Sequence, residues 1–182
     1  MCIAAWILGS RSPLFLPLAL KSKFTPMKND RPWIAILAGA AGGAVAIAAM
    51  EFLAERTAVP LAFIPFATSI VMVMGSPEAK PAQPRALVGG HLLSAAVGLV
   101  MVTIAGPQPW AAAVAIGIAM IVMHVTDTFH PPAGINPLLV VVNDRSWSFL
   151  VVPIAAGVVI LVGFAYLWHN VTRRGSWPVR WW

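Results

Sequence analysis

The chain has 182 residues, of which 59% are hydrophobic and only 10% are charged. A water-soluble domain of this length cannot bury so much apolar surface, so the composition excludes an ordinary soluble protein and predicts one compact membrane domain in a lipid bilayer. The net charge of +6 does not indicate nucleic-acid binding, because the basic residues lie between apolar runs, as the flanking charges of membrane helices do.

Four apolar stretches are predicted to cross the membrane, which requires about 20 residues of helix. They run from 33 to about 53, from about 86 to 105, from 110 to about 125 and from about 149 to 168, and the third is only marginally long enough. Two further apolar pieces, 59–75 and 133–142, are interrupted by proline or too short to span a bilayer alone. We therefore expect an all-α transmembrane helix bundle of four full spans and two short half-helices.

The ends of the chain differ in composition from this bundle. We expect residues 1–30 to be a dispensable or partly disordered N-terminal segment, 31–170 to form the transmembrane domain, and 171–182 to be a basic and aromatic C-terminal tail. The residues from Met27 onward would be a more usual N-terminus for an inner-membrane protein than the residues from Met1 onward. The single cysteine, Cys2, excludes an internal disulfide.

The two short pieces resemble each other at a spacing of 67 residues, which lays Pro65 on Pro132 and Ser69 on Asn136. Each piece stands between two longer spans, so the chain reads as a two-fold repeat. Three crossings per repeat would make the halves inverted, a common build of secondary transporters. Six crossings with the N-terminus inside obey the positive-inside rule better than four crossings with two re-entrant pieces, and both arrangements stay open.

The short pieces are candidates for an anion site. Ser69 and Asn136 are good helix N-caps, and Pro137 suits a first helical position, so we expect residues 132–136 to be extended and a half-helix to follow each cap. The N-termini of two inverted half-helices would meet near the membrane centre, where free N–H groups attract an anion. Alternatively, the prolines only kink packed helices. The predicted substrate-binding residues are Ala67, Thr68, Ser69, Gly134, Ile135 and Asn136.

Ionisable residues inside a membrane are costly, so a functional role is the default hypothesis for them. His91 follows Gly90, which with Ser94 and Gly98 forms a stripe of small residues that predicts a helix-packing face. The His91 ring could simply donate to a backbone carbonyl. Glu51 is expected near the outer interface, where it could pair with Arg56. The candidates for proton handling or gating are His91, His130, Asp127 and Glu51.

His124, Asp127 and His130 are spaced by three residues. This spacing could ligate a metal, or it could pair His124 with Asp127 on one helix face. Pro131 disrupts the helix and no further ligand is obvious, so we expect neither a metal nor a cofactor. No P-loop, dinucleotide loop or nucleophile motif is present, and we expect no enzymatic activity.

Four segments in order resemble the HPP family of integral membrane proteins. They are PFATS (65–69), GSP (75–77), QPRALVGGHLLSA (83–95) and HPPAGINPLL (130–139), the last with the motif His130-Pro131-Pro132. The resemblance covers about residues 33–168 and implies four transmembrane helices. Plant and cyanobacterial members are linked to nitrite transport, which implies a small monovalent anion as substrate. Family members often carry Gly-Ala where this chain has Ala67-Thr68, which leaves nitrite itself open.

The favoured interpretation is a transporter or channel for a small monovalent anion, with nitrite as a candidate. We expect it in a bacterial inner membrane with both termini cytoplasmic, and its small-residue stripes could support a homo-oligomer. Two alternatives stay open. One is a non-transporting membrane subunit that docks partner helices, and the other is a metal-dependent membrane enzyme using His124, Asp127 and His130.

Overall fold

The computed structural model describes residues 33–57 and 64–182 of the chain. These residues form only helices and connecting loops, which confirms the all-α prediction. The expected N-terminal segment 1–30 and the first residues of the piece predicted at 59–75 lie outside the described residues. In chain order the elements are α1 (Trp33–Thr57), α2 (Ile64–Gly75), η1 (Lys80–Ala82), α3 (Pro84–Ala105), α4 (Pro109–Val125), η2 (Pro131–Ile135), α5 (Asn136–Val142), η3 (Leu150–Ala155) and α6 (Ala156–Thr172).

Three described elements are long and apolar enough to cross a membrane, namely α1, α3 and the segment Leu150–Thr172, which is made of η3 and α6 and is kinked at Val152. The helix α4 has 17 residues, which makes it about 25 Å long, against about 30 Å for a bilayer core. A fourth full span therefore stays a prediction. The helix ends at Val125. Asp127, two residues later, has a positive φ of 57°, a left-handed conformation that is common just after a helix C-terminus.

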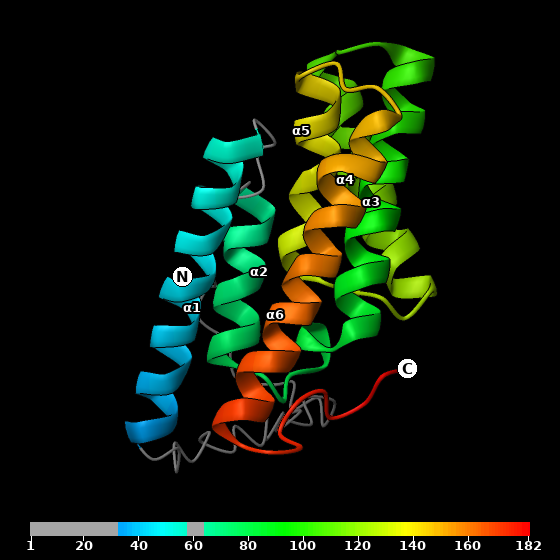
Figure 1. The fold of residues 1–182 in the computed structure, drawn as a ribbon. Helices are drawn as coiled ribbons and strands as arrows, with labels where there is room; N and C mark the ends of the chain where they lie inside the picture. Colours follow the sequence, from blue (N-terminus) through cyan, green and yellow to red (C-terminus); the bar gives the residue numbers. More distant parts are fainter. Residues whose placement is uncertain (1–32, 58–63) are drawn as a thin grey trace, which may run out of the picture. The chain divides into compact units, whose positions relative to one another are not determined.

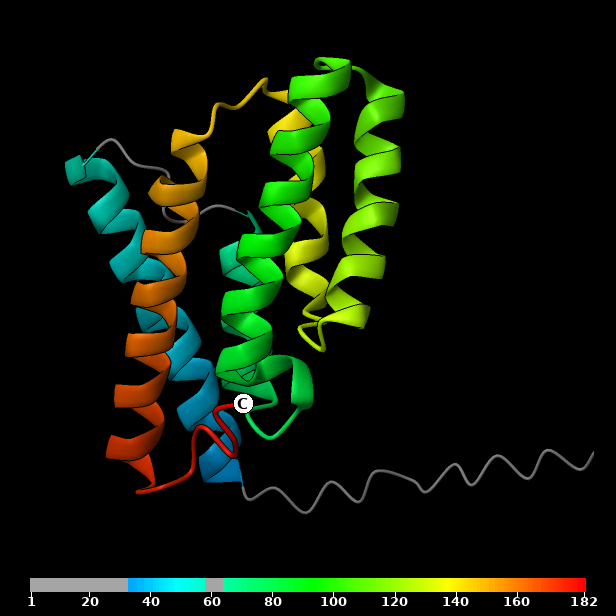
Figure 2. The same cartoon turned by 90° about the vertical axis from the view of Figure 1, so that its right-hand side faces the viewer.

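The two short helices run in opposite directions along α3 (Figure 1, Figure 2). The helix α2 ends at Gly75, and the loop 76–83 leads from there to the first turn of α3. The helix α5 begins beside His91 and continues past Gly98, where an added Cβ would lie 3.0 Å from the Cβ of Val140. The first turns of the two short helices therefore approach each other beside His91. Their directions are compatible with the inverted repeat, which stays a prediction.

Both short pieces become helical earlier than expected. The helix α2 begins at Ile64, and Pro65 fits its first turn because a proline ring presets a helical φ there. Ser69 therefore lies inside the helix, where its Oγ is 2.6 Å from the Pro65 carbonyl oxygen, and the prediction that it caps the helix was wrong. A serine inside a helix commonly bonds back to the carbonyl four residues earlier.

The second short piece also differs from its prediction. Residues 131–135 form the 3₁₀ helix η2 instead of an extended entry, because two prolines preset the φ angles of its first turn. Asn136 is the first residue of α5, but its side chain makes no capping hydrogen bond, so the predicted N-cap was wrong. His130, just before the prolines, is extended as expected, with φ −130° and ψ 98°.

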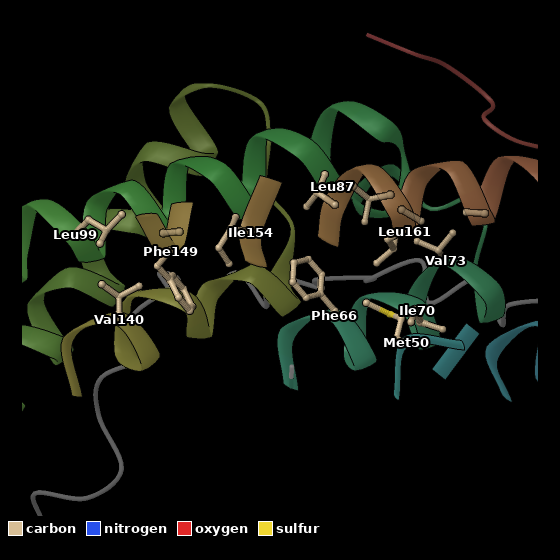
Figure 3. Packing of buried hydrophobic residues seen from close by; sticks show 14 of the residues in the cluster. Met50, Phe66, Ile70, Val73, Leu87, Leu99, Val140, Phe149, Ile154 and Leu161 are labelled. Carbon is tan, nitrogen blue, oxygen red and sulfur yellow. The ribbon is translucent and has the colours of Figure 1, made fainter. Parts of the chain in front are cut away.

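The apolar core runs along the bundle, and Figure 3 shows Phe66 between two groups of core side chains. The Phe66 ring is fully buried and fills the space beside Gly157, where an added Cβ would lie 2.7 Å from the ring. Phe66 thereby joins α2 to α6. The two groups are Leu99, Val140, Phe149 and Ile154 on one side and Met50, Ile70, Val73 and Leu161 on the other.

Part of the predicted C-terminal tail packs against the loop that precedes α3. The Trp177 side chain is 1% exposed, and its indole Nε1 donates to the Ala82 carbonyl at 3.0 Å. The Gln83 Oε1 accepts from the backbone N–H of Val179 at 2.9 Å. The chain after α6 therefore returns to the end of the bundle where α3 begins.

Replacing Trp177 by phenylalanine is expected to lower the free energy of unfolding by about 1–2 kcal/mol, because the apolar ring stays buried while the indole hydrogen bond is lost. The matched control is Trp181→Phe. The Trp181 side chain is 53% exposed, so this substitution should change the free energy of unfolding by less than about 0.5 kcal/mol. Thermal unfolding in detergent micelles measures both. Equal effects of the two substitutions would contradict the packing of the tail.

Candidate functional site

Five fully buried polar side chains meet beside α3 in an otherwise apolar interior. They come from four parts of the chain: α2, α3, the segment before η2, and the start of α5. A polar cluster removed from water is stable only when its members bond to one another, because each unpaired group costs free energy. The five residues are Ser69, His91, Ser94, His130 and Asn136.

Ser69 stands between the two histidines. Its Oγ lies 2.9 Å from Nε2 of His91 and 2.7 Å from Nε2 of His130. The other ring nitrogen of His130, Nδ1, lies 2.7 Å from the Pro81 carbonyl oxygen. The two imidazole rings are tilted by 50° with their centroids 5.2 Å apart. Ser69 is placed there by α2, whose Phe66, three residues earlier, also faces α3 and stacks on the His91 ring with centroids 4.7 Å apart.

Asn136 connects the two network residues of α3, His91 and Ser94. Its Nδ2 donates to Ser94 Oγ at 2.9 Å and to the His91 carbonyl at 3.3 Å, and lies 3.2 Å from His91 Nδ1. These contacts fix the orientation of the amide, because a flipped amide would place its oxygen against the His91 carbonyl. The Oδ1 atom is buried and has no hydrogen-bond partner within the described part of the chain. The site therefore contains one unsatisfied acceptor.

The network, together with the Pro81 carbonyl that it contacts, extends from one end of the bundle towards its middle. Pro81 lies in the loop before α3, whereas Ser94 is ten residues into this 22-residue helix. His91 is seven residues from Pro84, or about 10 Å along the helix axis. The network therefore lies nearer to one face of the bundle than the expected central position.

The predicted small-residue face of α3 is confirmed as a packing surface. An added Cβ at Gly90 would lie 2.6 Å from the His130 Cβ and 3.0 Å from the Thr128 carbonyl oxygen. One at Gly98 would lie 2.8 Å from the Pro137 Cα. The absence of side chains at these two glycines lets η2 and α5 come close enough for His130 and Asn136 to reach His91 and Ser69.

Comparison with known proteins now identifies the family. The family pattern described as "HPP, transmembrane region" matches residues 28–178. The chain belongs to the HPP family. Two curated transmembrane proteins of Dictyostelium discoideum are similar to it, with 35% and 36% identity over 125 residues. The match covers 64% of this chain but only 40% and 44% of those relatives, so the chain spans less than half of their length. No solved structure matches the chain significantly.

Membership of the HPP family, together with the three long apolar helices, makes the chain an integral membrane protein. The HPP motif has a clear structural role here. His130 supplies the buried ring, while Pro131 and Pro132 start η2 and turn the chain so that α5 begins beside His91. The Ala133 N–H donates to the His130 carbonyl at 3.0 Å, which fixes the histidine to the turn that follows it.

The structure brings only part of the predicted substrate-binding set to the network. Ser69 and Asn136 belong to it, whereas Ala67, Gly134 and Ile135 are half-buried beside it. The Thr68 side chain is exposed, and its hydroxyl donates to the Pro65 carbonyl. A small cavity between α1, α2 and α6 is lined only by apolar residues, including Met50 and Val73, and lies apart from the network.

The predicted proton-handling residues separate into two groups. His91 and His130 lie at the centre of the network, whereas Glu51 is exposed on α1. Asp127 is also exposed and accepts from the Lys80 ammonium, not from His124. This hydrogen bond lowers the pKa of the Asp127 carboxyl, so the pair contributes to stability at neutral pH and is lost as the carboxyl becomes protonated in acid.

The three residues spaced as a metal motif do not converge. The His124 ring is exposed and stacks on Phe129 with centroids 4.1 Å apart, Asp127 pairs with Lys80, and His130 is buried against Ser69 and Pro81. One member of the network and one backbone group that it contacts were not predicted as parts of the site. Ser94 appeared only as a small residue of the packing stripe, and the Pro81 carbonyl has no sequence signal beyond its position in a proline-rich loop.

Proposed function

We propose that this HPP protein carries a small monovalent anion across the membrane, and that the buried network is the centre of the transport pathway. The observation that supports this proposal is the position of the network. Five polar side chains lie where the first turns of two oppositely directed short helices meet, inside a bundle whose other buried residues are mostly apolar. Such an arrangement is costly in a membrane and is typical of transport sites.

The unsatisfied Asn136 Oδ1 favours an anion accompanied by a proton. A buried acceptor without a partner costs about 1–3 kcal/mol, and only a hydrogen-bond donor relieves that cost. A bare anion offers no donor, whereas the conjugate acid of a weak acid does. The amide N–H groups of Asn136 are already used by Ser94 and His91. Nitrite and formate, whose acids are weak, therefore fit better than nitrate or chloride.

Uptake by the full chain in liposomes tests the proposal. Nitrite, formate, nitrate and chloride are offered in turn, with and without an acidic outside. We expect saturable uptake of the weak-acid anions that increases with the inward proton gradient, and at least a tenfold (~1.4 kcal/mol) loss in Asn136→Leu. The matched control is Asn143→Leu, because Asn143 is an exposed residue at the end of α5 whose amide only donates to the Leu139 carbonyl.

Each outcome of this experiment decides between interpretations. If folded and correctly inserted protein moves none of the four anions, the non-transporting subunit becomes the better explanation. If Asn143→Leu is as defective as Asn136→Leu, the network is not the site.

We also propose a bacterial inner-membrane location with both termini on the cytoplasmic side. In this arrangement the loop that contains Lys80 faces the cytoplasm. A cysteine placed at Lys80 in a Cys2→Ser background should react with a membrane-impermeant reagent only in inverted vesicles. Reaction from the outside of intact cells would support four crossings with re-entrant pieces instead.

A further inference from the structure

The hydrogen atoms of the network can be assigned from the chemistry of its partners. A backbone carbonyl only accepts, so the contact between His130 Nδ1 and the Pro81 oxygen requires a hydrogen on Nδ1. In its neutral form His130 therefore carries a free lone pair on Nε2, the atom that lies 2.7 Å from Ser69 Oγ. A second proton on His130 can bind only at this nitrogen.

His91 is held in the opposite form. Its Nδ1 faces the amide nitrogen of Asn136, which only donates, so Nδ1 must be the accepting atom and the hydrogen must be on Nε2. That Nε2–H donates to Ser69 Oγ at 2.9 Å. A proton added to His91 at Nδ1 would face the N–H groups of Asn136 and break the contact. The geometry therefore keeps His91 neutral.

Ser69 has three close neighbours but only one hydroxyl hydrogen. Its Oγ accepts from His91 and lies 2.7 Å from His130 Nε2 and 2.6 Å from the Pro65 carbonyl. When His130 is neutral, the hydroxyl donates to His130. When His130 is protonated, its Nε2–H donates to Oγ and the hydroxyl rotates to the Pro65 carbonyl. Each state satisfies both histidines, and they differ only by one proton and one hydroxyl rotation.

We infer that His130 is the proton-binding site of this network, and that the Ser69 hydroxyl is the switch that lets the proton enter and leave. The inference rests on the proposed function only in taking this proton to be the one that is transported with the anion. It assigns different roles to two histidines that the sequence does not distinguish. His130 takes up the proton, and His91 orients Ser69.

The surroundings of His130 allow the two histidines, His91 and His130, to take up only one added proton between them. Of the elements that contact η2, α2 and α5 contain no ionisable side chain, and α4 contributes only the exposed His124. From α3, His91 faces the ring, and Arg85 donates to the Thr126 carbonyl. The adjoining loops contribute Glu78, Lys80 and Asp127, all exposed and the last two paired with each other. A charged His130 would oppose a second charge on His91 at a centroid distance of 5.2 Å.

Nitrogen NMR of histidine-labelled protein in micelles tests the proton site without any transport measurement. The chain has only four histidines, so His→Gln variants assign every signal. At high pH we expect His130 as the Nδ1–H form and His91 as the Nε2–H form. On acidification His130 alone of these two should gain a proton. In Ser69→Ala, the His130 titration midpoint should fall by about one pH unit, because the charged ring loses a stronger hydrogen bond than the neutral ring does.

Thr68→Ala is the matched control for this titration. Its hydroxyl also donates to the Pro65 carbonyl, but its side chain is exposed whereas Ser69 is buried, so the His130 midpoint should not move. Proton uptake by His91 instead, an Nε2–H form of neutral His130, or an unchanged midpoint in Ser69→Ala would each overturn the inference.

A transport measurement separates this inference from the proposed function. In liposomes, His130→Gln should lose the acceleration of uptake by an acidic outside. If the wild-type chain moves no anion but His130 titrates as described, the proton site stands and anion transport fails. If the anion moves and the response to the gradient survives in His130→Gln, transport stands and the assignment of its proton to His130 fails.

Discussion

Replacing Gly90 by valine is expected to destabilise the protein by at least about 3 kcal/mol and to abolish its function. A Cβ at this position would lie 2.6 Å from the Cβ of His130 and 3.0 Å from the Thr128 carbonyl oxygen. Neither atom is the end of a flexible side chain, so the segment before η2 would have to move away from α3. This movement would withdraw His130 from Ser69, which it contacts at 2.7 Å.

The matched control for this substitution is Gly117→Val. Gly117 lies inside α4, is exposed, and has nothing within 4 Å of an added Cβ. Its replacement should change the thermal midpoint in micelles very little and leave the histidine NMR spectrum intact. Equal stability of the two valine variants would show that α3 and η2 are not packed as closely as described.

Truncation of Phe66 to alanine is expected to cost about 3–5 kcal/mol, the usual range for removing a fully buried aromatic ring. The ring is 0% exposed, stacks on His91 with centroids 4.7 Å apart, and fills the space beside Gly157. The loss should therefore appear both as a lower unfolding midpoint and as a change in the His91 NMR signal. Phe52→Ala, at an exposed position on α1, is the matched control.

A second substitution makes this prediction specific to the contact between α2 and α6. Gly157→Leu should be strongly destabilising in the parent chain, because the added Cβ would lie 2.7 Å from the Phe66 ring. In the Phe66→Ala background it should be tolerated and should recover part of the lost stability, giving a coupling of about 0.5–3 kcal/mol. Additive effects of the two substitutions would contradict the contact.

Much of the fold could be predicted from apolar length and proline positions. The ranges expected for the first, second and fourth spans agree closely with α1, α3 and Leu150–Thr172. The errors were confined to the starts of the short helices. Pro65 and the prolines of the HPP motif were interpreted as ends of extended chain, although a proline fits the first turn of a helix equally well. Sequence alone does not decide between these uses of proline, because both need the same φ.

The site was predictable in its residue types but not in its connections. The cost of ionisable groups in a membrane singled out His91 and His130, and the repeat singled out Ser69 and Asn136; all four side chains lie buried in the network. Glu51 and Asp127 met the same criterion but are exposed, Glu51 on α1 and Asp127 in the loop after α4. The meeting of Ser69 with both histidines depends on packing between segments distant in sequence, which no local pattern encodes.

The close packing of Gly90 and Gly98 against residues 128–137 also limits how this protein can be recombined with its relatives. These two stretches are separated in the chain by the whole of α4. They nevertheless pack so closely that there is no room for one added methyl group at Gly90 or Gly98. A hybrid that takes α3 from one HPP protein and the motif segment from another combines two packing surfaces that did not evolve together. Exchanges that keep both stretches from one parent, and replace α1 or α4 instead, should fold far more often.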